Sequence, residues 1–448
     1  MLRLRFVLSI IIISILLSAA PSHAEDSPAA ILAAMDSLEK KLEWANYRLA
    51  EEKWENYRFG RSDSLSFYND LYLYVISSTD IYQYSKSLGN LAERADRQRL
   101  QILLSEITND RIEMRPAIKD IKDSLTGIVD SYTVDFQGES KTLDDVKDLY
   151  HNSRSRSQRE LGCKAWYSIG ENLAPGMKKL INERNDAASK LGFDNYWDFI
   201  STQFSQNGVD LLQFIKAVDS LTQTGYSEFI VGSRSTLGIN QMELWDVEFT
   251  HSQINQHGDS FFPADSHLAF IRRGLKSAGF TLEQLPIFIE SVPRNPLDFG
   301  TLSFAIRPPN DIRILSESKS GFQSLHSLLS HSGIALYSAF IAQERPLYSF
   351  AADTTWQLAM GEIIGAMVYD SIWLNDVANM PLGFISQFRR AKLEEETIKV
   401  RKLLTNISFI FEAYTNPDRD LNQLYWDLYQ KYTGLSRHDD IIIWATEP

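Results

Sequence analysis

Residues 328–340 read LLSHSGIALYSAF, and a polar insert, SHSG at 330–333, interrupts an otherwise apolar helical pattern. Apolar residues at helical spacing lie on both sides of the insert, namely Leu325, Leu329, Leu336 and Phe340. This spacing predicts a helix over 321–343 that buries one face. Polar side chains in the middle of a buried helix need a reason, and that reason bears on whether the chain has catalytic groups.

A second helix is predicted to begin near Asp353, where Thr354 and Gln357 match a capping box. Its buried stripe is expected to consist of Trp356, Met360, Ile363 and Met367. The other face is also apolar, with Ile364, Val368 and Ile372. A helix over 354–374 with two apolar faces is expected to lie deep in the protein.

One hairpin precedes these helices. TLSFAIR at 301–307 and IRIL at 312–315 flank the turn residues 308–311. Leu302, Phe304 and Ile306 alternate with smaller or polar residues, as in a half-buried strand. Other strand-like stretches are scarce: helical spacing covers 27–58, 64–108, 111–130 and 142–200, with breaks at Pro175, Gly192 and Asp194, and a turn-rich interval covers 232–266. The predicted class is mostly α with a small sheet.

The composition is that of a globular protein. The 448 residues are 44% hydrophobic and 23% charged, and they can form one large domain or two lobes. The formal net charge of −13 argues against general nucleic-acid binding.

The N-terminus has the three parts of a signal peptide. Arg3 and Arg5 precede an apolar run over 6–17, and small residues follow at Ser22 and Ala24. Residues 1–24 are therefore expected to be removed, which predicts a periplasmic or secreted protein without stable membrane insertion. An uncleaved anchor is the alternative. Cys163 is the single cysteine, so an internal disulfide is excluded.

The hairpin and the two helices resemble the active-site core of gluzincin zinc peptidases, particularly the angiotensin-converting-enzyme-like and oligopeptidase-like families. Members carry H-E-x-G-H on the first helix and a zinc-binding Glu on the second. Two His at i and i+4 bind zinc from one helical face, and the Glu between them is the general base. The stretches DIRIL, GIALYSAF and ADTTWQLAMGE carry the resemblance here.

In the alignment that this resemblance gives, none of the zinc-binding residues is present. When Gly333 is aligned with the motif glycine, Ser330 and Ile334 take the two His positions and His331 takes that of the catalytic Glu. Leu358 takes the position of the third ligand. Starting the motif at His326 or His331 gives no second His four residues later. The resemblance thus implies a zinc peptidase scaffold from which the metal ligands and the base are lost, with no catalytic residue and no cofactor.

Alternative sites are weaker. A relocated metal site would combine His331 with Glu362 or Glu344. His251 and His257 are expected to be surface histidines, and Cys163 a buried thiol. A basic cluster is expected to be a solvated helix face: Arg154, Arg156, Arg159 and Lys164.

The resemblance extends over about 140–445 and includes the stretches 155–199 and 411–435. It divides the chain into a signal peptide (1–24), an N-terminal helical region (25–139) and a peptidase-like helical domain (140–448) with the degenerate metal motif at 330–334 and 358, and it implies a two-lobed helical fold. In the family, chain beyond the WA-x-x-P region supplies His and Tyr side chains that stabilise the oxyanion. The sequence here ends at WATEP, so this stabilisation is also expected to be missing.

Two hypotheses about function follow. The favoured one is an exported, non-catalytic homologue of zinc peptidases that binds an extended peptide or a protein partner. In the family, the strand beside the metal helix pairs with extended peptide, so Leu302, Phe304, Ile306 and His331 are the binding candidates. The alternative is an active zinc metallopeptidase with a non-standard site. A third hypothesis is a truncated product that folds poorly.

Overall fold

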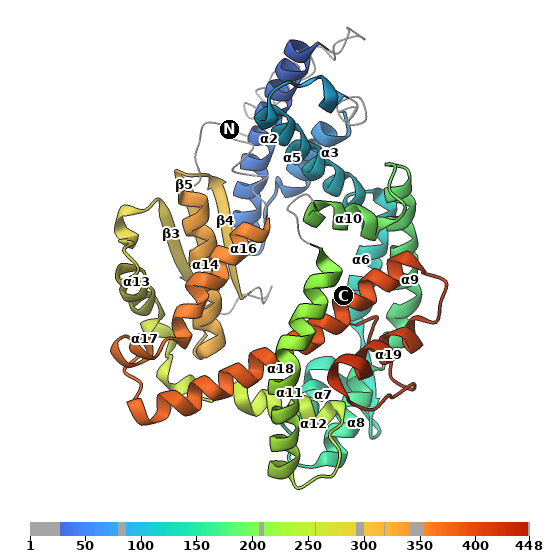
Figure 1. Ribbon diagram of the computed structural model, residues 1–448, viewed down its shortest axis with the longest axis vertical. Helices are drawn as coiled ribbons and strands as arrows, with labels where there is room; N and C mark the ends of the chain where they lie inside the picture. Colours follow the sequence, from blue (N-terminus) through green and yellow to red (C-terminus); the bar gives the residue numbers. More distant parts are fainter. Residues whose placement is uncertain are drawn as a thin grey trace. The chain divides into compact units, whose positions relative to one another are not determined.

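The computed structural model describes residues 27–78, 87–205, 210–255, 257–292, 300–317, 319–340 and 354–446. These residues are mostly helical and carry a two-stranded and a three-stranded sheet (Figure 1). This confirms the predicted fold class. No helix in the described ranges is long and apolar enough to cross a membrane.

The chain forms two compact units that interleave along the sequence. The first holds the described residues of Met1–Arg111, Leu275–Lys319 and His326–Ala366. The second holds those of Ile112–Gly274, Ser320–Leu325 and Met367–Pro448. These units are defined by contacts in space and do not coincide with the division of the sequence at 139/140. That division was drawn from the extent of the sequence resemblance and stays a prediction.

The first unit is built around a long helix and the three-stranded sheet. Its elements are α2 (Pro28–Phe59), α3 (Leu65–Ser77), η1 (Ser87–Asn90), most of α5 (Arg94–Glu113), η4 (Leu282–Gln284), β3 (Ile287–Val292), β4 (Thr301–Arg307), β5 (Asp311–Glu317), most of α14 (Phe322–Phe340) and α16 (Thr354–Gly365). α2 is capped at its N-terminus by Ser27, whose hydroxyl accepts a hydrogen bond from the Ala30 N–H at 3.3 Å, and at its C-terminus by Gly60 with a φ of +72°.

The sheet of the first unit has the order β3–β5–β4. β5 is central: it runs parallel to β3 and antiparallel to β4. The predicted hairpin is confirmed as β4–β5, whereas β3 was not predicted. Leu302, Phe304 and Ile306 face α2, where they pack around Trp54. The alternate residues of β4 face the other way, toward α14, so the two helices lie on opposite faces of the sheet (Figure 1).

The second unit is almost entirely helical. Its elements are α6 (Pro116–Ser131), β1 (Thr133–Phe136), β2 (Glu139–Thr142), α7 (Leu143–Asn152), α8 (Arg156–Tyr167), α9 (Gly170–Ser189), α10 (Tyr196–Ser205), α11 (Leu211–Leu237), α12 (Leu244–Asn255), η2 (Asp259–Phe261), η3 (Ala264–Ser266), most of α13 (His267–Ser277), η5 (Ala366–Tyr369), α17 (Ser371–Asp376), α18 (Leu382–Thr415) and α19 (Leu421–Thr433). An aromatic-rich core joins α8, α12, α18 and α19, with Trp426 fully buried in it.

Several predicted boundaries differ from the structure. The interval 232–266 is not mainly turns, because α11 runs to Leu237 and α12 fills 244–255. Pro175 lies within α9 and does not break it. The hairpin β1–β2 was missed; its turn places Gln137 at a φ of +57° and Gly138 at +86°.

Candidate functional site

The polar insert of α14 lies where α16 crosses it. A Cβ on Gly333 would be 2.3 Å from the Met360 carbonyl oxygen, so the two helices meet backbone to backbone. A Cβ on Gly361 would lie 3.0 Å from the Ser330 carbonyl oxygen. A Cβ on Gly365 would lie 2.3 Å from the Ser330 hydroxyl. Small residues on both helices are what this close crossing requires, and this explains the insert without any catalytic role.

The positions that correspond to zinc ligands do not form a metal site. Ser330 and Ile334 are half-buried against α16, and the buried Ser330 hydroxyl has no hydrogen-bond partner among the residues that the structure describes. Leu358, on α16, is 54% exposed. One hydroxyl and two aliphatic side chains lack the imidazole and carboxylate donors that hold zinc, so these residues do not fit the metal.

The relocated site finds no support in the structure either. Glu362 is exposed, and Glu344 lies outside the described residues. Within the described ranges, no group of three or more His, Cys, Asp or Glu is arranged to hold a metal ion.

His331 links α14 to the edge of the sheet. Its Nδ1 lies 3.3 Å from the Ser303 hydroxyl on β4. The ring is half-buried, and burial lowers the pKa of His331 from its ordinary value. A neutral imidazole therefore stands at the position that the sequence resemblance aligns with the general base of zinc peptidases. It offers one donor and one acceptor nitrogen for a polar contact.

The backbone of β4 has one unpaired side among the described strands, because β4 is the edge of its sheet. The Glu317 N–H donates to the Gly300 carbonyl at 2.8 Å, which places these two residues at a hydrogen-bonded position of the antiparallel ladder. On the other side of β5, the Ile312 N–H donates to the Pro286 carbonyl at 3.0 Å. Together, these two bonds show which residues of β5 direct their backbone N–H and C=O groups toward β4 and which direct them toward β3.

Antiparallel pairing alternates along the strand, so the outward groups follow from this register. Leu302 and Phe304 pair with Leu315 and Arg313 of β5 and direct their N–H and C=O groups inward. The alternate residues direct theirs outward, away from β5: Thr301, Ser303 and Ala305. The irregularity between Ala305 and Arg307 ends this run. Ser303 and Ala305 are half-buried whereas Thr301 is buried, so Ser303 and Ala305 are the residues of this edge that an extended peptide can reach.

The predicted binding residues are not all brought together. The side chains of Leu302, Phe304 and Ile306 pack on the α2 face, and the Phe304 ring meets Trp54 edge-on at 5.5 Å. His331 lies on the opposite face. Sequence reasoning missed Ser303 and Ala305, whose only signal was their place as the small members of the alternation. Leu302, Phe304 and Ile306 remain predictions as binding residues.

The predicted surface histidines are partly buried. His251 lies on α12, with Nδ1 3.8 Å from a Glu248 oxygen and Nε2 3.9 Å from a Glu395 oxygen. Glu395 is fully buried and pairs with the fully buried Lys392 at 3.0 Å. His257 stacks on Phe384. The prediction was wrong because Glu395 and Phe384, which cover these rings, come from α18, far away in the sequence.

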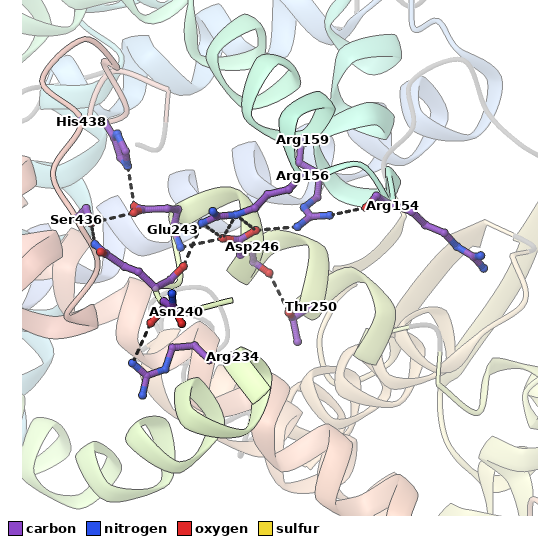
Figure 2. A network of polar contacts seen from close by, with 11 residues as sticks. Arg154, Arg156, Arg159, Arg234, Asn240, Glu243, Asp246, Thr250, Ser436 and His438 are labelled. Carbon is purple, nitrogen blue, oxygen red and sulfur yellow. Dashed lines mark hydrogen bonds and ion pairs between the residues drawn. The ribbon is translucent and has the colours of Figure 1, made fainter. Parts of the chain in front are cut away.

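The basic cluster departs from the predicted solvated face at one residue: Arg159 is buried, whereas Arg154, Arg156 and Lys164 are exposed. Figure 2 shows Arg156 and Arg159 of α8 reaching the Asp246 carboxylate at the start of α12. Arg159 donates to Asp246 at 2.7 Å, and both side chains are buried. Arg156 donates at 2.8 Å and is 44% exposed. The pairs fasten α8 to α12, which is a structural function. Cys163 on α8 is buried as predicted, and burial raises the pKa of its thiol.

The same network contains a serine, a histidine and a glutamate. Ser436 donates to one Glu243 oxygen at 3.1 Å, and His438 Nε2 lies 3.0 Å from the other (Figure 2). Both side chains bond to the glutamate rather than to each other, so this is not a nucleophile with its base. It ties the segment after α19 to the start of α12.

No family model and no curated protein matches the chain. Among solved structures, the fold is similar to a 3.1 Å crystal structure of a protein provisionally assigned as oligoendopeptidase F. The TM-score is 0.56 at 14% sequence identity, over 96% of this chain and 84% of that one. At this identity the likeness establishes the fold.

Proposed function

We propose that the chain is an exported peptide-binding protein, built on a zinc-peptidase-like scaffold, that does not hydrolyse peptides with zinc. The observation that carries the proposal is the outer edge of β4. There Thr301, Ser303 and Ala305 present backbone donors and acceptors away from β5, on the strand that His331 contacts. Edge pairing of this kind gives affinity through the main chain.

The likeness to a structure that bears a peptidase name supports an extended peptide as the ligand. The crossing of α14 and α16 supports the loss of hydrolysis. Ser330 and Ile334 fill the space against α16, and Leu358 supplies no donor atom. A neutral His331 in place of a glutamate also gives no carboxylate base for a metal-bound water.

The main test combines binding and cleavage. A library of unstructured peptides is titrated into the mature protein by calorimetry, and the mixtures are then examined by mass spectrometry with and without added zinc. The proposal expects binding of some peptides and intact peptides in every mixture. Zinc-dependent cleavage would support the active metallopeptidase instead, and the absence of any binding would overturn the proposal.

A second test probes the mode of binding without changing the protein. A bound peptide is N-methylated at one residue at a time, which removes one backbone donor at each step. Because the outward groups of β4 occur at every second residue, affinity should fall at alternate peptide positions only. A uniform effect along the peptide would contradict edge pairing.

A pair of variants tests the same edge from the protein side. Ser303→Pro removes the outward N–H of that residue and should abolish binding. Ser303→Ala keeps the N–H and removes only the hydroxyl beside His331, so it should retain most of the affinity. Phe304→Pro is not a suitable test, because the Phe304 N–H faces β5. Circular dichroism of both variants checks that they fold.

Export is proposed from the sequence of residues 1–24, which lie outside the described ranges. The mature protein should begin near Glu25 in the periplasm or medium. N-terminal sequencing of the protein from its native cell checks this, and retention of Met1 on a cytosolic product would contradict it.

A further inference from the structure

The end of β4 carries a positive charge that no described carboxylate neutralises. Arg307 is exposed, and its guanidinium carbon lies 3.8 Å from the centre of the Tyr47 ring on α2. The Tyr47 hydroxyl donates to a Glu51 oxygen at 2.7 Å. The ring is thus fixed from its far end, and stacking holds the guanidinium in place above it.

The nearby carboxylates already have cationic partners. Asp311, opposite Arg307 in the ladder, accepts two hydrogen bonds from Arg313 at 2.9 and 2.7 Å. The second Glu51 oxygen pairs with Arg48 at 2.7 Å. Within the described residues, the five N–H donors of the Arg307 guanidinium therefore have no carboxylate partner, and they can donate to an acceptor on a ligand.

The position of Arg307 relates it to the outer edge of β4. The outward-facing groups end at Ala305, and Arg307 follows after the irregularity at residue 306. A peptide that pairs parallel to β4 would bring its C-terminal end toward Arg307. A peptide that runs the other way would bring a side chain near its N-terminal end there.

We infer that Arg307 binds a carboxylate of the peptide on the outer edge of β4, an inference that rests on the proposed function. Guanidinium and carboxylate groups match in a two-point, charge-assisted hydrogen bond. Since the protein has a net charge of −13, its surface in general disfavours acidic ligands, and an arginine without a carboxylate partner among the described residues is the feature that favours one. The stack on Tyr47 reduces the freedom lost on binding.

The carboxylate that Arg307 binds is either the C-terminus of the peptide or an acidic side chain, and chemically altered peptides distinguish the two. A peptide that binds the wild-type protein is prepared in four forms. Its C-terminus is either a free carboxylate or an amide, and in each case its acidic positions carry either Glu or Gln. Affinities are measured by calorimetry for the wild type, Arg307→Met and Arg307→Lys. Arg390→Met, which removes an exposed arginine of α18 in the second unit, is the matched control.

Arg307→Met should weaken the carboxylate form about tenfold and leave the neutral form unchanged. Arg307→Lys should keep part of the affinity, and Arg390→Met all of it. Sensitivity to amidation identifies the C-terminus as the source, and sensitivity to Gln identifies a side chain. Equal weakening of acidic and neutral forms would overturn the inference, since Arg307 would then act only on the fold.

The proposed function can survive the failure of this inference. If Arg307→Met changes no affinity while Ser303→Pro abolishes binding, carboxylate recognition is wrong and edge pairing stands. If no peptide binds the wild type, both are overturned.

Discussion

A Cβ atom on Gly333 would lie 2.3 Å from the carbonyl oxygen of Met360, so α14 and α16 cross with their backbones in contact. The neighbouring atom is backbone and cannot rotate away. Any side chain at position 333 must push α14 and α16 apart. This separation would also disrupt the packing of Ser330 and Ile334 against α16.

Gly333→Ala should therefore destabilise the protein by on the order of 2 kcal/mol, although alanine is the better helix former. Gly232→Ala in α11 is the matched control, because a Cβ there would meet nothing within 4 Å. The control should leave stability unchanged or raise it by up to about 1 kcal/mol. Urea unfolding of the two variants measures the difference, and similar effects would contradict the close crossing.

The purified protein should contain no stoichiometric zinc. The three ligand positions of the resembling motif hold Ser330, Ile334 and Leu358, which lack nitrogen and carboxylate donors. Elemental analysis after dialysis against a weak chelator checks this. A content near one zinc per chain that is lost in His331→Ala would show a metal site elsewhere around α14.

The helix pattern around the insert could be predicted, but the buried face of the next helix could not. Leu325, Leu329 and Leu336 are buried as expected, whereas Phe340, predicted on the same face, is 62% exposed. In α16, however, Trp356 and Ile363 are each 63% exposed, and the buried positions are Gly361, Ile364 and Gly365 together with Val368 in η5. Both faces are apolar, so hydrophobicity did not distinguish them. The close crossing with α14 selects the face that has glycines.

Other missed features depend on partners far away in the sequence. Arg159 looked solvated because its partner Asp246 lies 87 residues later. The alternation in TLSFAIR predicted a strand and its two faces, yet it contains no information on which N–H groups point outward. That requires the pairing register with β5, and for this reason Phe304 was predicted as a binding residue whereas Ser303 was not.

The arginines that meet at Asp246 should differ strongly in their contributions to stability. Arg159 and Asp246 are both buried, so Arg159→Met leaves a buried carboxylate with only part of its compensation and should cost about 3–5 kcal/mol. Arg156 is 44% exposed, and Arg156→Met should cost about 1 kcal/mol or less. Chemical unfolding of both variants checks this order. Equal losses would mean that burial does not set the strength of these pairs.

Glu113 should make stability depend on pH in the acid range. Its carboxylate accepts hydrogen bonds from Arg184 at 2.8 and 2.9 Å and from the Tyr196 hydroxyl at 2.8 Å, and it pairs with Lys122. Burial alone would raise the pKa of Glu113, but the hydrogen bonds from Arg184 and Lys122 outweigh it. The pKa of Glu113 is lowered from 4.5 to about 2.

Because the folded protein holds the Glu113 proton more weakly than the unfolded chain, the stabilisation is complete above about pH 5 and is lost as the pH falls toward 2. Glu113→Gln should therefore cost about 2 kcal/mol at pH 7, allowing for partial solvent screening, and progressively less between pH 5 and pH 3. Glu171→Gln, which changes an exposed carboxylate of α9, should stay within about 0.5 kcal/mol of the wild type throughout. Urea unfolding at stepped pH measures both, and a constant difference between Glu113→Gln and the wild type would show that this carboxylate is not held in its charged form by its partners.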